Sequence, residues 1–176
     1  MEPVLKAIFD RRSIRRYTGE PVSREVLTEL VRAGMAAPTS RDTRHFYFVV
    51  VDDMSLIHKM AEELPYAKML LTAKHAIVVA SDLSLAHGGD STDYWVQDCA
   101  AAAQNILIAA QVLGLGACWT AAHPRPERAS AVRAILGLSE SISPLCVIAV
   151  GHPVGGDKPR DKFDPAKLFF NAVGKH

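Results

Sequence analysis

The sequence predicts a layered α/β or α+β sandwich, in which helices pack on a central sheet, and three observations support this. Short apolar runs rich in β-branched and aromatic residues, typical of buried strands, recur along the chain. Segments with apolar residues at helical spacing separate them, and this alternation favours a layered sandwich. The 176 residues are 49% apolar and 22% charged, as in a globular domain with a real core. No repeat or linker divides the chain, so residues 1–176 are predicted to form one domain.

The first part of the chain is expected to hold two helices and a loop. Residues 3–10 have the pattern of a short helix with a proline early in its first turn. Ser23 is placed to cap a helix that runs to about Met35, because an apolar stripe at helical spacing follows it. Pro38 closes this helix, and the polar sequence APTSRDTRH around it is typical of a loop.

Strands and helices alternate over the rest of the chain. Composition predicts strands at 46–52, 76–82, 116–120 and 144–151, and helices at 55–64 with Ser55 as the cap, at 93–113, and at 126–136 ending near Gly137. The sequence LAHGGDST, which contains two glycines, is expected to be a flexible loop. From about residue 152 the tail is irregular and basic, and we expect it to be extended.

A stretch without any Asp, Glu, Lys or Arg runs from Cys99 to Pro124. Glutamine and asparagine interrupt its apolar residues, and glycines end the run before it reaches the roughly 18 residues of a membrane span. We therefore expect a helix buried within protein rather than in a membrane. The cysteines, Cys99, Cys118 and Cys146, lie in apolar surroundings without a CxxC spacing, which predicts reduced structural thiols and a cytoplasmic location.

The composition and motifs exclude several classes of function. A net charge of +1 argues against a globally basic nucleic-acid-binding protein. The seven histidines show no H-E-x-x-H spacing, so no metal site is expected, and neither a P-loop nor a G-x-S-x-G elbow occurs. GLGACW has two glycines of a dinucleotide-binding motif but follows a predicted helix rather than a strand. If the protein is an enzyme, an organic cofactor is the expected source of its chemistry.

Two basic clusters lie near opposite ends of the chain, in the sequences RRSIRRY and DKPRDKF. In each, alternate residues would share one face if the segment is extended. Arginine binds phosphate with parallel hydrogen bonds, and a serine hydroxyl or a backbone N–H serves a further oxygen. Two clusters that close on one dianion would form a phosphate site; the alternative is a solvated basic turn and an exposed basic tail. The residues in question are Arg11, Ser13 and Arg15 in the first cluster, and Lys158, Arg160 and Lys162 in the second.

Two further features are compatible with a ligand. The loop residues Thr39, Ser40 and Asp42 suit ribityl or ribose hydroxyls, although loops contain such residues in any case. Lys68, in PYAKML, precedes a buried strand and could stabilise an anion that develops on a cofactor ring. The alternative for this lysine is that it simply extends to water.

In their order, these motifs resemble the FMN-dependent nitroreductase family in its short single-domain form. RRSIRRY is similar to the N-terminal arginine–serine signature of that family, and AAPTSRDTRHFYFVVVDD stands where the family has a proline–serine–serine loop and its first core strand. PYAKMLLTAKHAIVVASD and DYWVQDCAAAAQNILIAAQVLGLGACWTAAHP resemble the next family segments, and VIAVGHP with KPRDKF matches the closing strand and basic tail. The resemblance runs from about Ile8 to Phe163.

The resemblance implies an α/β/α sandwich with a central mixed sheet, in an intertwined homodimer that holds two FMN molecules between its subunits. The charge-free helix would lie at this interface, and the tail from about residue 152 would reach the partner. The resemblance implies three sets of FMN-binding residues. The phosphate and ribityl chain would be contacted by Arg11, Arg12, Ser13, Arg15, Arg160 and Lys162. The partner's loop would contribute Pro38, Thr39, Ser40 and Asp42, and the residues near the flavin ring would be Lys68, Trp119, Thr120 and Ala121.

The activity that the resemblance implies is transfer of hydride from NAD(P)H through flavin N5 to a nitroaromatic, quinone or related acceptor, by a ping-pong mechanism. The alternatives are a non-redox FMN-binding or storage protein, a flavoenzyme of different chemistry such as dehalogenation or flavin fragmentation, and an interaction protein. The loop departs from the family pattern, because Asp42 replaces Asn and Arg44-His45-Phe46 replaces Gln-Pro-Trp. These changes bear on the acceptor more than on the cofactor, and no side chain is expected to act as a general acid or base.

Overall fold

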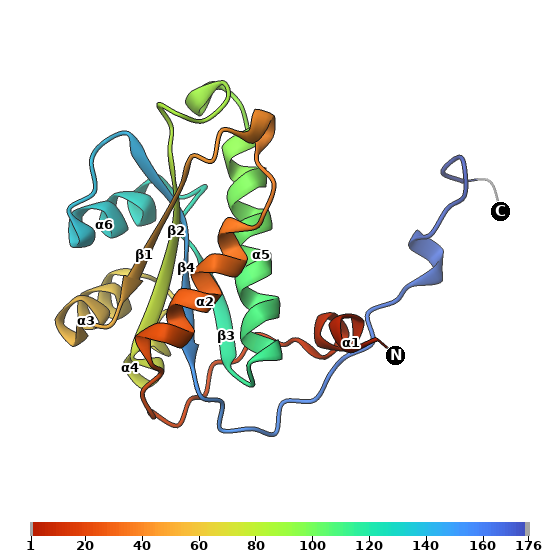
Figure 1. Ribbon diagram of the computed structural model, residues 1–176, viewed down its shortest axis with the longest axis horizontal. Coiled ribbons are helices and arrows are strands. Elements are labelled where there is room, and N and C mark those ends of the chain that lie inside the picture. Colours follow the sequence, from red (N-terminus) through yellow and green to blue (C-terminus); the bar gives the residue numbers. More distant parts are fainter. Residues whose placement is uncertain (1, 175–176) are drawn as a thin grey trace.

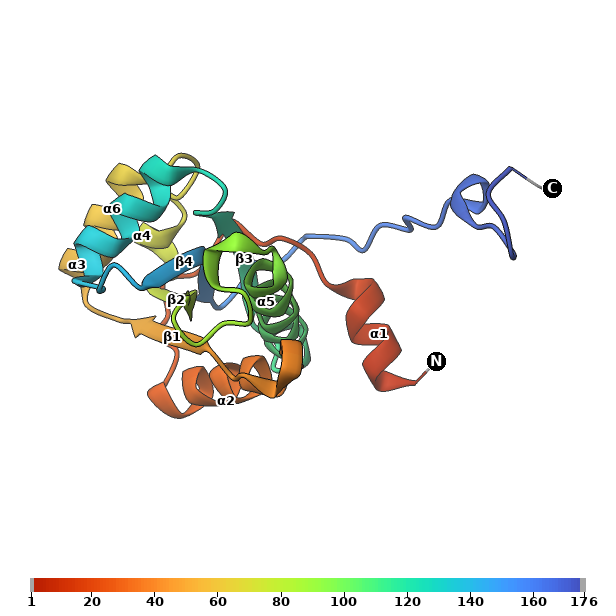
Figure 2. The ribbon, with the colours of Figure 1, turned by 90° about the horizontal axis from the view of Figure 1, so that it is seen from above.

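The computed structural model describes residues 2–174, which form a three-layered body and two arms (Figures 1 and 2). The helices are α1 (Pro3–Asp10), α2 (Arg24–Met35), α3 (Met54–Glu63), α4 (Leu70–Ala73), α5 (Tyr94–Val112) and α6 (Pro126–Leu136), and the strands are β1 (Phe46–Val51), β2 (His75–Asp82), β3 (Gly116–Ala121) and β4 (Ile142–Gly151). The sheet lies between α2 and α5 on one face and α3, α4 and α6 on the other. The predicted domain covers 1–176, of which residues 1, 175 and 176 lie outside the described residues.

The sheet has the strand order β1–β2–β4–β3, and its neighbouring strands are antiparallel. The α+β sandwich predicted from the sequence is confirmed, but the expectation of a mixed sheet is corrected. A continuous apolar run indicates burial on both faces and leaves the direction of the strand undetermined, so the pattern could not decide this point. Within residues 2–174, parallel pairing outside the sheet is limited to an isolated bridge between Ser13 and Ala117.

Each face of the sheet carries its own hydrophobic core. The core toward α2 and α5 contains Leu27, Trp95 and Ile106, and the core toward α3, α4 and α6 contains Ile57 and Leu70. The two central strands contribute to both cores, because successive side chains point to opposite faces. Each fully buried side chain of this kind stabilises the fold by about 1.5–3 kcal/mol relative to an exposed one.

Most of the predicted elements are confirmed, with one wrong cap. The Ser23 hydroxyl accepts a hydrogen bond from the Val26 N–H at 3.3 Å, as expected for the cap of α2. At α3 the predicted cap Ser55 is wrong, because Asp53 takes this position and its carboxylate accepts from the Ser55 N–H at 2.7 Å. An ionised carboxylate is a stronger acceptor than a hydroxyl for the free N–H groups of a helix start. The helix α6 ends as expected at Gly137, which has a left-handed backbone.

The structure departs from the prediction most clearly at α4 and at the start of β4. The helix α4 was not predicted, because its four residues are too few to show helical periodicity. The strand β4 begins at Ile142 rather than at 144. Pro144 lies inside it and has no N–H to donate, and the register with β2 shifts between Val79 and Ala80, opposite this proline.

The arms run alongside each other where they leave the body (Figure 1). The Thr18 N–H donates to the His152 carbonyl at 2.9 Å, and the Val154 N–H donates to the Arg16 carbonyl at 3.1 Å. From residue 155 to residue 174 the tail is largely exposed and forms no strand, with one 3-10 turn at Pro165–Lys167. The chain therefore brings its two basic clusters to the same side of the molecule.

The three cysteines are buried and free, which confirms the prediction of structural thiols. Burial raises the pKa of each thiol above its ordinary value, so all three stay protonated at neutral pH. The cytoplasmic location stays a prediction. Within residues 2–174 no helix has both the length and the apolar character needed to cross a bilayer.

Candidate functional site

Two buried side chains fix the position of the N-terminal basic segment along β3. The Ile14 N–H donates to the Ala117 carbonyl at 3.0 Å, and the Ile14 side chain lies against Gly116, where an added Cβ would come within 2.7 Å of Ile14 Cγ2. The Tyr17 hydroxyl donates to the Ile14 carbonyl at 2.6 Å. Burial raises the pKa of the Tyr17 phenol far above its ordinary value, so the phenol is a permanent donor.

The arginines of this segment divide into two sets by position. Arg12 donates to the Lys158 carbonyl at 2.7 Å, and Arg16 donates to the Gly155 carbonyl at 3.4 Å. These two arginines therefore fasten the N-terminal segment to the tail. Arg11 and Arg15 line two different cavities, so the structure does not bring Arg15 together with Arg11 in the way that a shared phosphate site would need.

One cavity, of about 630 Å³, joins cations from both ends of the chain. Arg11 lines it from the N-terminal segment, and Arg160 and Lys162 line it from the tail. Ile8, Phe9 and Phe163 supply apolar walls, and Asp161 is the one carboxylate in its lining. The cavity thus carries a net positive charge, which suits a phosphate dianion.

A second cavity, of about 610 Å³, brings Arg15 together with Lys68. Met69 lines it from just before α4 and Thr72 from within α4, and Glu62 is its carboxylate. Its lining also contains Tyr66, which sequence reasoning did not select. Here the structure places one cation from the first basic cluster beside the predicted lysine.

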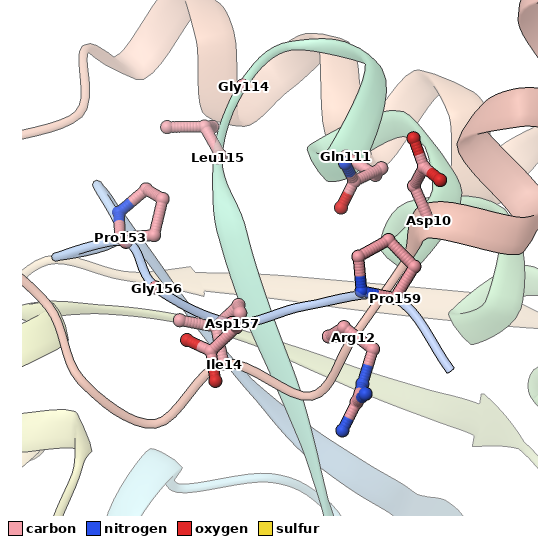
Figure 3. A pocket seen from close by; sticks show the side chains of 11 residues that line it. Asp10, Arg12, Ile14, Gln111, Gly114, Leu115, Pro153, Gly156, Asp157 and Pro159 are labelled. Atoms are coloured by element: carbon pink, nitrogen blue, oxygen red, sulfur yellow. The ribbon is translucent and has the colours of Figure 1, made fainter.

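Arg12 lies apart from the other predicted phosphate ligands. It lines a cavity of about 290 Å³ between the arms and the end of α5, together with Asp10, Gln111 and Asp157 (Figure 3). The two carboxylates would repel a phosphate in this cavity. Arg12 is therefore a structural link in this arrangement, and the structure does not bring it together with Arg11, Arg160 and Lys162.

The strand β3 is an edge strand of the sheet, and it carries the predicted stretch Trp119, Thr120 and Ala121. The Ala117 carbonyl points away from β4, because it accepts from Ile14. Since backbone direction alternates along a strand, the N–H and C=O groups of Trp119 and Ala121 also face this outer edge. The Trp119 side chain packs against the core toward α2 and α5, and Thr120 is buried.

The loop that contains Pro38, Thr39, Ser40 and Asp42 lies at the other end of α5. Its Ser40 N–H donates at 2.9 Å to Asp98 near the start of this helix, whereas Gln111 near the end of the helix lines a cavity between the arms. At a rise of 1.5 Å per residue, about 20 Å of helix separates these two positions. A single chain therefore does not bring this loop to the basic clusters.

Side-chain and backbone hydrogen bonds hold the loop in an unusual conformation. Arg41, Asp42 and Arg44 all have positive φ, between 49° and 55°. The Arg44 guanidinium donates two bonds to the Asp42 carboxylate, at 2.8 and 2.7 Å, and lowers the pKa of that carboxyl below its ordinary value. The Arg44 N–H also donates to the Thr39 hydroxyl at 3.1 Å. Pro38, Asp42 and Arg44 line a further cavity of about 530 Å³.

A buried polar network that sequence reasoning missed links this loop to α5 and β2. His45 Nε2 lies 2.9 Å from Asp98 Oδ2, and Ser81 Oγ lies 2.8 Å from His45 Nδ1. Because a carboxylate only accepts, we assign the proton to Nε2, and Nδ1 then accepts from the serine. Ser81 is fully buried, so this serine–histidine–aspartate set cannot reach a substrate as a hydrolase triad would. Asp98 could have been suspected from its place between Trp95 and Ala102 on the buried stripe of α5.

The described residues 2–174 contain no group of three or more His, Cys, Asp or Glu side chains placed to hold a metal ion. What they offer instead is a cationic cavity between the arms, a second cationic cavity, and the outer edge of β3, which Ile14 of the N-terminal segment meets at Ala117. Such an arrangement can hold an elongated, phosphate-bearing molecule with a polar ring.

Comparison with known proteins identifies the family. The model of the nitroreductase family matches residues 8–65 and 55–152. An Archaeoglobus fulgidus protein, provisionally named an NADH dehydrogenase/NAD(P)H nitroreductase, is 39% identical over 96% of this chain and 97% of its own length. A solved Parabacteroides distasonis structure of the same provisional name is 42% identical with a TM-score of 0.92, over 98% of this chain and 99% of that chain.

A third similar protein is provisionally named a nitroreductase of Desulfovibrio desulfuricans, and its solved structure contains FMN. It is 31% identical with a TM-score of 0.80, over 98% of both chains. With the family model matching nearly the whole body of the fold, the chain belongs to the nitroreductase family.

Proposed function

We propose that two copies of this chain bind FMN between them and pass hydride from NAD(P)H to a nitroaromatic or quinone acceptor. The chain is an NAD(P)H-dependent flavin oxidoreductase with FMN as its cofactor, as its family and the names of its relatives support. The observation that carries the proposal further is the convergence of Arg11, Arg160 and Lys162 on one cavity.

The residues present fit the cofactor. In the proposal, Arg11, Arg160 and Lys162 hold the phosphate, and Ser13 donates to it or to the ribityl chain. Arg15 and Lys68, which line one cavity, would stabilise negative charge on the pyrimidine side of the ring, and the outer backbone groups of Trp119 and Ala121 would face the ring. Bound FMN supplies the hydride chemistry, for which the protein needs no acid or base of its own.

The dimer in the proposal follows from the distance between the parts of the site. The loop with Pro38, Thr39, Ser40 and Asp42 lies about 20 Å along α5 from the arms, so it can border the same cofactor only from a second copy. The exposed apolar side chains of α1, among them Leu5, Ile8 and Phe9, offer a surface for this contact.

The reaction in the proposal balances for a quinone. NAD(P)H gives two electrons and one proton as hydride, solvent gives the second proton, and the products are NAD(P)⁺ and the hydroquinone. Donor and acceptor use the same place in turn, which predicts ping-pong kinetics.

The phosphate clamp is tested by comparing FMN with riboflavin, which lacks the phosphate. We expect the double variant Arg160→Gln with Lys162→Gln to lower FMN affinity by about 10- to 100-fold, because two charge-assisted hydrogen bonds are lost. Riboflavin affinity should stay the same. The matched control removes two exposed charges that line neither cavity, Lys59→Gln with Lys167→Gln, and should leave both affinities unchanged.

The redox role is tested on the purified wild type. We expect a yellow protein whose flavin absorbance bleaches on anaerobic mixing with NADH or NADPH. Equal loss of FMN and riboflavin binding in the double variant would defeat the clamp, and a flavin that neither donor bleaches would favour a non-redox FMN-binding protein.

A further inference from the structure

Tyr66 stands in a turn whose geometry does not favour it. The Ala67 N–H donates to the Leu64 carbonyl at 3.2 Å, which closes a β-turn with Pro65 and Tyr66 at its centre. Proline sets a negative φ at the first central position, and Tyr66 has φ of +63° at the second, so the turn has the signs of type II. That second position favours glycine or asparagine, and a bulky residue there is an outlier.

Packing within the chain does not explain the tyrosine. Its side chain is 89% exposed, whereas Leu64 and Ala67 on either side are buried. The buried neighbours hold the turn in place, and the aromatic ring projects from it. A residue that breaks a local rule without a folding benefit indicates a functional constraint.

Tyr66 is one of the residues that line the cationic cavity containing Arg15 and Lys68. The cavity, of about 610 Å³, is large enough for more than one aromatic ring system. Its remaining lining is largely aliphatic, from Leu64, Pro65 and Met69, so Tyr66 is its aromatic wall.

We propose that Tyr66 is a specificity-determining residue that stacks on the planar ring of the electron acceptor beside the flavin. The proposal rests on the proposed function, and it adds the residue that would select acceptors with a flat aromatic ring over acceptors without one. Offset stacking of two aromatic rings contributes beyond the area that it buries. A tyrosine on a rigid turn gives this contact with few rotatable bonds to restrict.

The test distinguishes the effect of the aromatic ring from the effect of the turn conformation. Tyr66→Asn removes the ring but keeps a residue that tolerates positive φ, and Tyr66→Phe keeps the ring. Lys74→Asn is the matched control, because Lys74 is also exposed and has φ of +64° but does not line the cavity. All four proteins are studied with FMN bound.

The first readout is binding of redox-inert ligands by calorimetry. Wild type, Tyr66→Phe and Lys74→Asn should prefer 2-naphthoate to cyclohexanecarboxylate, which has the same charge but no flat ring. Tyr66→Asn should lose about three- to tenfold of that preference, with an unfolding midpoint that is not lowered. An unchanged preference in Tyr66→Asn overturns the inference.

The second readout is the oxidative half-reaction in stopped flow, with photoreduced enzyme. Tyr66→Asn should react about three- to tenfold more slowly with low concentrations of menadione and unchanged with ferricyanide, which has no ring. Equal slowing with both, or a dissociated dimer, would assign Tyr66 to another role and overturn the inference. A wild type without bleachable flavin would instead defeat the proposed function itself.

Discussion

The polar groups at the two ends of α5 differ in whether they have partners within the chain. At its start, the loop with three left-handed residues is fastened by Asp98, His45 and Ser81, whose polar atoms satisfy one another. At its end, the arms leave Arg11, Arg160 and Lys162 around one cavity, and none of these three cations forms an ion pair among the described residues. One end of the helix is therefore preorganised by its own partners, whereas the cations at the other end are left available to a ligand, as the proposed function requires.

The largest effect is expected where the preorganised end is broken. Asp98→Ala leaves the Ser40 N–H and His45 Nε2 without their acceptor in a buried place, and should lower the free energy of unfolding by about 2–4 kcal/mol. Chemical denaturation measures this. Asp98→Asn should cost less, because its side-chain oxygen can still accept both bonds. Asp90→Ala, at an exposed carboxylate, is the control. A loss for Asp98→Ala within 0.5 kcal/mol (roughly the spread of surface substitutions) would contradict the idea of a fastened loop.

An intermediate effect is expected where the N-terminal segment meets β3. In Gly116→Ala the new Cβ would lie 2.7 Å from Ile14 Cγ2 and 2.8 Å from Ile14 Cβ, so the segment must shift. Overpacking of this kind costs about 1–3 kcal/mol, and we expect FMN affinity to fall as well because Arg11 and Arg15 move with Ile14. Gly114→Asn has open space and a backbone that Asn tolerates, so it should change neither stability nor affinity. If Gly116→Ala lowers stability but leaves FMN affinity unchanged, the N-terminal segment does not contribute to the FMN site.

The smallest effect is expected at the exposed pair of the loop. The Arg44 hydrogen bonds depress the pKa of Asp42, and in Arg44→Gln this pKa should rise toward its ordinary value. A depressed carboxyl pKa stabilises the fold above its unfolded pKa, and this is lost as the pH falls through the folded pKa. Because solvent screens the pair, we expect the NMR titration of Asp42 to shift while the melting temperature at neutral pH stays unchanged. A marked drop in melting temperature would show that the pair, and not Asp98, holds the loop.

The sequence predicted the body of the fold well and the links between its parts poorly. Buried strands and amphipathic helices leave local patterns, so they could be recognised within short windows. The network of His45, Ser81 and Asp98 joins residues far apart in the chain, and no local pattern reports such a contact. The two basic clusters were visible from composition, but the separate place of Arg12 depends on the buried side chains of Ile14 and Tyr17, which set the register of the segment.

The open side of β3 has a consequence for how the protein behaves without its ligand. Ile14 covers only the beginning of this border, and the outward backbone groups of Trp119 and Ala121 are left as a template for another strand. A flavin bound along this edge would shield these backbone groups from pairing with a strand of another molecule, and would so protect the protein from aggregation. Loss of the yellow colour during storage and the onset of turbidity should therefore coincide.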